Sequence, residues 1–155
     1  YLFPEAMLRL RPKVLETLAP GTRVLSNSFD FGAWKPDRHL ESASSGGLLV
    51  WIVPARVQGR WALRVDGRVL PLQLEQRFQE VAGTLGTGAA PSVLEDAVLE
   101  GSRIRFLVRD GERSWHFSGT VDGAEMSGFV QRRQGDYAEP LSWTARRAAG
   151  EAPGP

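Results

Sequence analysis

The chain has 155 residues, among them 19 Lys and Arg, 18 Asp and Glu, two His and no Cys. The absence of cysteine excludes disulfides, iron–sulfur clusters, cysteine-ligated zinc and cysteine nucleophiles, and His39 and His116 lack the spacing of a metal site. The net charge of +1 and the lack of a long apolar stretch predict a soluble, cytoplasmic protein that binds no metal, nucleic acid or membrane.

The amino-terminal part has the pattern of a helix followed by a strand. Apolar residues recur at spacings of three and four between Met7 and Leu18, which is typical of a helix with one buried side. Pro12 lies inside this pattern, so we expect a short turn followed by a helix that begins near it. Ala-Pro-Gly at 19–21 predicts the end of the helix, and 22–28 has the composition of a short strand.

A change of composition separates this part from the rest of the chain. Residues 37–47 are rich in Ser and Gly and have no hydrophobic period, so we predict a linker there. From 48 to 147, apolar and polar residues alternate in short runs, which is typical of antiparallel strands with one buried face. Residues 148–155 are predicted to form a flexible tail. The predicted strands are Leu48–Pro54, Arg60–Val65, Val69–Glu75, Arg77–Leu85, Val93–Leu99, Ile104–Arg109, Ser114–Val121, Met126–Gln131 and Leu141–Ala145.

Turn signals connect these strands. Asp-Gly pairs at 66–67, 110–111 and 122–123 predict three hairpins, because they supply the positive φ angles that short turns need. Between Leu70 and Leu85 the alternation changes parity, and we predict a bulge or bend near 79–82. Consecutive hairpins in this number close into a barrel. The predicted fold is mainly β: an antiparallel meander or small barrel of residues 48–147, preceded by a helix and a strand.

The opening residues resemble a known family. Residues 1–15, Tyr-Leu-Phe-Pro-Glu-Ala-Met-Leu-Arg-Leu-Arg-Pro-Lys-Val-Leu, and 18–32, Leu-Ala-Pro-Gly-Thr-Arg-Val-Leu-Ser-Asn-Ser-Phe-Asp-Phe-Gly, resemble the second half of a class I S-adenosylmethionine-dependent methyltransferase. In that family the Leu-Arg-Pro phrase lies in the helix after the fourth strand, and Pro-Gly-Thr-Arg-Val introduces the fifth. The resemblance implies that residues 1–36 are the end of a Rossmann-like α/β domain, and that the full-length protein is a methyltransferase.

The resemblance also implies where cofactor and substrate would bind, and that an upstream half is needed to bind the cofactor. The family's Gly-x-Gly-x-Gly turn is absent, so S-adenosylmethionine would bind only together with an upstream half, in the same polypeptide or co-purifying. The first residue is not Met, and we expect a segment upstream of it. The residues expected near cofactor or substrate are Tyr1, Leu2, Phe3, Pro4 and Glu5, beyond the end of a parallel strand, and Asp30. The acceptor, a small molecule or a protein, and any catalytic residue stay unknown.

The β region leaves a different function open. As an alternative, the chain is a non-enzymatic β-barrel that binds an apolar ligand in a lumen lined by Trp51, Trp61, Trp115 and His116. Such rings more often fill the interior of a barrel, and a strand histidine without acidic or Cys companions is more often structural. A third hypothesis makes the β region a surface for self-association.

Overall fold

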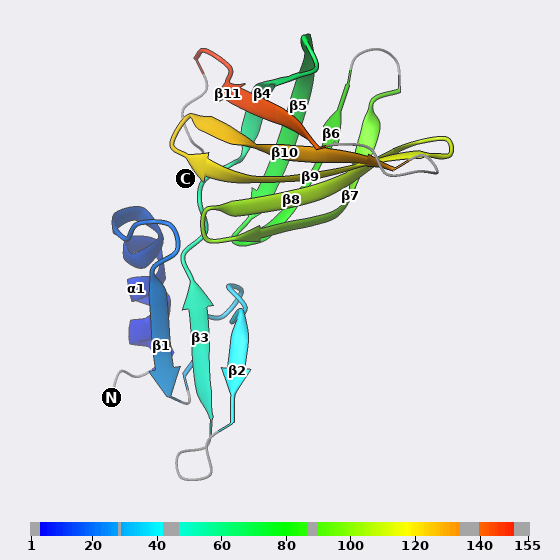
Figure 1. Cartoon of the computed structure of the whole chain (residues 1–155). Coiled ribbons are helices and arrows are strands. Elements are labelled where there is room, and N and C mark those ends of the chain that lie inside the picture. Colours follow the sequence, from blue (N-terminus) through cyan, green and yellow to red (C-terminus); the bar gives the residue numbers. More distant parts are fainter. Residues whose placement is uncertain (1–3, 28, 42–46, 87–89, 134–139, 151–155) are drawn as a thin grey trace. The chain divides into compact units, whose positions relative to one another are not determined.

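The structure, a computed structural model, describes residues 4–27, 29–41, 47–86, 90–133 and 140–150. The chain divides into two compact units, Tyr1–Pro54 (unit 1) and Ala55–Pro155 (the barrel). Their elements are drawn in Figure 1. In chain order they are α1 Pro4–Thr17, β1 Arg23–Asn27, β2 Arg38–Leu40, β3 Leu48–Ile52, β4 Gly59–Val65, β5 Arg68–Arg77, β6 Glu80–Leu85, β7 Ser92–Glu100, β8 Arg103–Asp110, β9 Arg113–Asp122, β10 Glu125–Arg133 and β11 Leu141–Arg147.

The boundary between the units falls later than the sequence predicted. β3, which we assigned to the β domain, pairs with β1 and β2 and belongs to unit 1. The predicted linker at 37–47 contains β2. The composition of β3 identifies a strand, but its partners are set by non-local packing, which a local pattern does not encode.

The helix of unit 1 is one element rather than a turn and a shorter helix. α1 contains Pro12, and its buried residues are Met7 and Val14. A proline removes the donor for the carbonyl group four residues earlier, here that of Leu8. Both Pro12 and Leu8 lie on the exposed side of α1, where water can replace that donor. Gly21, with a φ of 90°, follows the helix in the left-handed conformation that we predicted.

The strands of unit 1 form an antiparallel sheet in the order β1-β3-β2. β1 and β2 therefore run in the same direction, with β3 between them (Figure 1). The segment that crosses from β1 to β2 buries Phe31 and Trp34 against Trp51 of β3, with ring centroids 4.9 to 6.3 Å apart. Trp51 Nε1 donates to Trp34 O at 2.8 Å, and Arg11 Nη1 donates to Phe31 O at 2.8 Å. These bonds fix the crossing segment between the helix and the sheet.

The other eight strands form a closed antiparallel barrel, as predicted. All three predicted hairpins are present. At the first, Asp66 and Gly67 are the turn residues, with φ angles of 48° and 70°. At the other two, the aspartate ends its strand and the glycine, Gly111 or Gly123, opens the turn with a φ of 61° or 56°.

A further hairpin explains the change of parity in the predicted strands. β5 ends at Arg77 and β6 begins at Glu80, so Phe78 and Gln79 form a turn where we predicted a bulge or bend. Phe78 has a φ of 57°, which is rare for a bulky residue. Because the turn contains none of the residues that favour positive φ, no local signal marked it.

One junction of the barrel is short. Among the described residues, β6 and β7 pair only through Thr84 with Val93 and Leu85 with Ser92, whereas every other neighbouring pair of barrel strands shares five or more residue pairs. β7 also contains a register shift between Glu95 and Val98. The barrel is therefore closed by a two-residue ladder next to an irregular strand.

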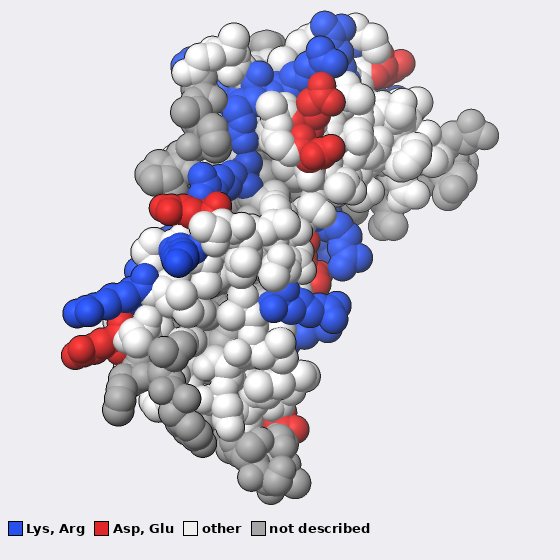
Figure 2. Space-filling view, turned by 90° about the vertical axis from the view of Figure 1, so that its left-hand side faces the viewer, with Lys and Arg blue, Asp and Glu red and all other residues white. Residues whose placement is uncertain are grey.

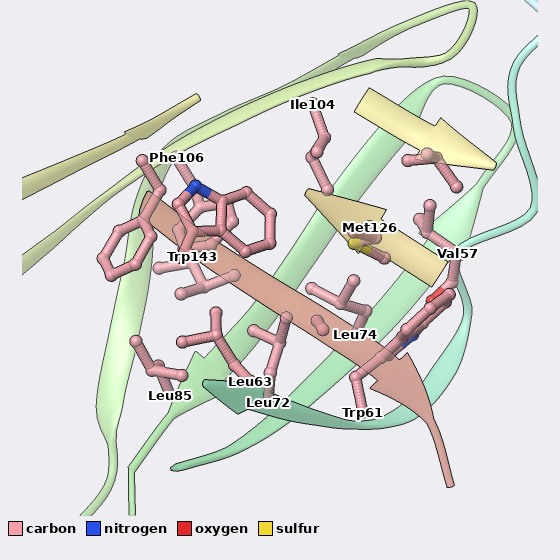
Figure 3. Packing of buried hydrophobic residues seen from close by; sticks show 14 of the residues in the cluster. Val57, Trp61, Leu63, Leu72, Leu74, Leu85, Ile104, Phe106, Met126 and Trp143 are labelled. Carbon is pink, nitrogen blue, oxygen red and sulfur yellow. The ribbon is translucent and has the colours of Figure 1, made fainter. Parts of the chain in front are cut away.

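Apolar side chains fill the interior of the barrel. An eight-stranded barrel is just wide enough for this. Figure 3 shows Trp143 and Phe106 toward one end of the cluster, and Trp61 and Val57 toward the other. The buried cluster draws on every barrel strand and consists of Ala55, Val57, Trp61, Leu63, Leu72, Leu74, Leu85, Leu94, Leu99, Ile104, Phe106, Val108, Phe117, Val121, Met126, Val130, Trp143 and Ala145.

Candidate functional site

Pro4, Glu5 and Asp30 are the described residues among those that the methyltransferase resemblance places near cofactor or substrate. α1 runs antiparallel to β1, so Pro4 and Glu5 lie at the same end of unit 1 as Asn27 (Figure 1). Both residues belong to the first turn of α1 and are exposed. The candidates at 1–3, Tyr1, Leu2 and Phe3, lie outside the described residues.

Asp30 lies in the turn that follows β1. Its Oδ1 accepts a hydrogen bond from Gly32 N at 2.9 Å, which shapes the turn. Gly32 has a φ of 67°, and a Cβ there would lie 2.8 Å from Leu8 Cδ2, so the turn packs directly on α1. The turn that contains Asp30 therefore contacts α1 through Gly32 and Leu8.

The four residues expected to line a lumen lie in different places. Trp51 is buried in unit 1. In the barrel, Trp61 is only 2% exposed and belongs to the packed interior, beside which Trp115 is half-buried. His116 follows Trp115 on β9 and points to the outer wall, where its Nε2 lies 3.4 Å from Ser114 Oγ. The interior that the structure describes is filled by side chains, so it gives the lumen hypothesis no support.

The outer wall of the barrel carries a groove that the sequence did not reveal. It consists of two adjoining hollows of about 640 and 740 Å³, which share Val98, Arg105, Ser118 and Phe129 as lining residues. His116 lines the first hollow. The second extends over β9, β10 and β11, and half of its lining residues are Gly, Ser or Thr.

Phe129 is the aromatic side chain at the centre of this groove. Met126 and Val130 of β10 point into the barrel and are buried, whereas Ser127 and Phe129 are exposed on the opposite side. Phe129 is 60% exposed. An aromatic residue on the polar side of an alternating strand was therefore the signal in the sequence, and we did not use it.

Neither metal-binding groups nor similarity to known proteins indicates a function for the described residues. The described residues contain no group of three or more His, Asp or Glu side chains that could hold a metal ion. In the same part of the chain, no helix is both long enough and apolar enough to cross a bilayer. Searches of family models, curated proteins and solved structures return no match. The geometry of the two units is thus the basis for assigning a function.

Proposed function

We propose that this chain is the carboxyl-terminal part of an S-adenosylmethionine-dependent methyltransferase, in which unit 1 forms the edge of a larger α/β sheet. The observation that carries the proposal is the open side of β1. One side of β1 pairs with β3, and no strand of the described residues pairs with the other. An unpaired edge invites pairing with another strand.

The connection between α1 and β1 defines which strand fits this edge. A strand that ended just before Pro4 would run antiparallel to α1 and therefore parallel to β1. Crossovers of this kind are right-handed and place consecutive parallel strands in one sheet. Pro4 and Glu5 would then follow the carboxyl end of that strand, where α/β sheets bind their ligands.

Apolar surface on unit 1 gives independent support. Leu25 is 57% exposed and Leu40 is 49% exposed. They pair with Val50 and Leu48 of β3, on the sheet face opposite Trp51. Strands of an α/β sheet are apolar on both faces because helices cover both. Arg23 and Arg38 lie on the same face, so a covering helix of the same larger domain would contact Leu25 and Leu40 between two basic residues.

The upstream half, unit 1 and the barrel would each have a different role in methyl transfer. The described residues contain no glycine-rich strand-turn-helix, so an upstream half would hold the cofactor. Pro4, Glu5 and Asp30 would lie beside the methyl acceptor and help to align it, which is the main demand of methyl transfer. The barrel would shape the acceptor site or a partner surface. The acceptor is a small molecule or a protein.

The test is purification of the protein from its natural source through an antibody against the barrel. We expect an α/β half to accompany these residues, in the same polypeptide or as a tightly bound second one. We also expect the purified material to crosslink to radiolabelled S-adenosylmethionine under ultraviolet light. A lone 17.1 kDa species without such crosslinking would contradict the proposal.

Leu25→Lys is expected to weaken the proposed assembly at least about tenfold, since it would bury an unpaired charge beneath the covering helix. The measurement is the amount of upstream half retained on an affinity-tagged variant in increasing salt. Leu18→Lys is the control, because Leu18 is 38% exposed and follows the end of α1 rather than lying on the sheet. Equal retention by the two variants would show that this face of the sheet is not covered.

A further inference from the structure

Small hydroxyl side chains form an ordered array on the outer wall of the barrel. The pairing register aligns one row from β11 to β7: Ser142, Phe129, Ser118, Arg105 and Val98. The adjacent row across the same strands is Thr144, Ser127, Thr120, Arg103 and Glu100. The two rows surround one aromatic ring with five hydroxyl groups, and all ten residues line the larger hollow.

The ring of Phe129 is accessible because its neighbours are small. Ser118 and Ser142 lie directly across from it on β9 and β11, where longer side chains would cover its faces. Ser118 Oγ donates to Phe129 O at 3.4 Å, beside the ring. Phe129 thus presents an exposed aromatic ring within a polar groove.

The groove is lined by two basic and two acidic residues, so its charges are balanced. Arg103 Nη2 lies 3.8 Å from Glu100 Oε1, and the other charged lining residues are Arg105 and Asp96. A polyanion requires an excess of basic groups. On the barrel face shown in Figure 2, acidic side chains lie beside a column of basic side chains. An uncharged ligand is the best match to the groove.

We propose that this groove binds a neutral oligosaccharide, with one sugar ring against Phe129 and hydroxyl groups bonded to Ser118, Ser142 and Arg105. Serine and threonine hydroxyls both donate and accept, as sugar hydroxyls do. The apolar face of a sugar ring can pack on an aromatic ring. In the OB-fold, another small β-barrel, an outer strand face binds oligonucleotides and oligosaccharides, and the balanced charge of this groove favours the latter. This binding site is independent of the methyltransferase proposal.

The test is a titration of the ¹⁵N-labelled full chain with cellohexaose, maltohexaose and xylohexaose, each up to about 10 mM, followed by amide chemical shifts. We expect at least one of them to shift amides of β9, β10 and β11 selectively. Phe129→Ser is expected to weaken that binding at least about tenfold. The control is Val69→Ser on β5, because Val69 is 50% exposed and does not line the groove. This variant should bind like the original chain.

Three results would overturn the proposal. The first is the absence of selective shifts with all three saccharides. The second is binding of oligothymidylate at the same amides, weakened by salt, since that identifies a nucleic-acid surface. The third is unchanged saccharide affinity in Phe129→Ser. The amide spectrum of this variant reports whether its barrel is intact, and Phe129→Leu replaces it if the spectrum is not.

Discussion

Replacing Gly128 by alanine is expected to lower the free energy of unfolding by at least about 3 kcal/mol. Gly128 of β10 faces Gly119 of β9. A Cβ on Gly128 would meet Ser118 O, and it would lie 2.5 Å from Gly119 Cα. Both obstacles belong to the backbone of the neighbouring strand, so β9 and β10 would have to separate to admit the methyl group.

Separation of these strands would also disturb the aromatic packing of the core. Trp143 Nε1 donates to Ser118 O and to Phe129 O, both at 3.1 Å, which anchors the indole ring to β9 and β10. The ring occupies the space that a side chain on Gly119 would fill, since a Cβ there would lie 2.5 Å from Trp143 Cζ2. The glycines and Trp143 therefore form one packing unit.

Urea unfolding followed by tryptophan fluorescence measures this effect. The control is Ser127→Ala, which changes the adjacent residue on the exposed side of β10 and should alter the free energy of unfolding by less than about 0.5 kcal/mol. If Gly128→Ala and Ser127→Ala unfold at the same urea concentration, the close approach of β9 and β10 is not required for stability.

The second large effect is expected at Gln76, whose side chain binds the backbone of residues 55–58 at the start of the barrel unit. Its Oε1 accepts from Val57 N at 2.7 Å and from Gln58 N at 3.3 Å. Its Nε2 donates to Ala55 O at 2.8 Å and to Phe78 O at 2.7 Å. One amide group thus satisfies four backbone groups outside the strand ladders. Gln76→Met keeps the length of the side chain, removes these bonds and should cost about 3 kcal/mol.

Arg147 and Trp61 also bind the backbone of this segment. Arg147 donates to Arg56 O and Gln58 O, both at 2.6 Å, and its guanidinium lies 4.3 Å from the centre of the Trp61 ring. Trp61 Nε1 donates to Val57 O at 2.8 Å. Side chains from β4, β5 and β11 therefore hold a stretch of backbone that pairs with no strand, and Val57 is fully buried beneath them.

Amide hydrogen exchange distinguishes the contribution of Gln76 from general packing. In Gln76→Met we expect the amides of Val57 and Gln58 to lose their protection before the rest of the barrel does. Gln73→Met is the control, since Gln73 is exposed on the same strand. Retained protection at Val57 in Gln76→Met would mean that burial alone holds the segment.

The strands of the barrel were predictable because each alternates in its own sequence. Ile104, Phe106 and Val108 form the buried side of β8, and only Leu107, which is also buried, breaks their alternation with exposed residues. The pairing partner of a strand was harder to predict. β3 carries the same apolar signal as the barrel strands, yet its place between β1 and β2 depends on Trp51 meeting Phe31 and Trp34, contacts that join distant residues.

The candidate sites were predictable to different degrees. The position of Glu5 at the end of unit 1 followed from a helix leading into a strand. Phe129 was visible as an aromatic residue on a polar face, but its hydroxyl surroundings required the register of four neighbouring strands. Gln76 was visible as a polar residue on the inward side of β5, in line with Leu72 and Leu74, but its bonds to residues 55–58 join distant parts of the sequence.

The ladder between β6 and β7, with two residue pairs, is the shortest that the structure describes in the barrel wall. Along the rest of its circumference, hydrogen-bonded ladders of at least five residue pairs join neighbouring strands, including β11 to β4. A closed wall opens first where the fewest backbone bonds must break. We therefore expect the amides of this ladder to lose their protection from hydrogen exchange before those of the longer ladders in the barrel wall.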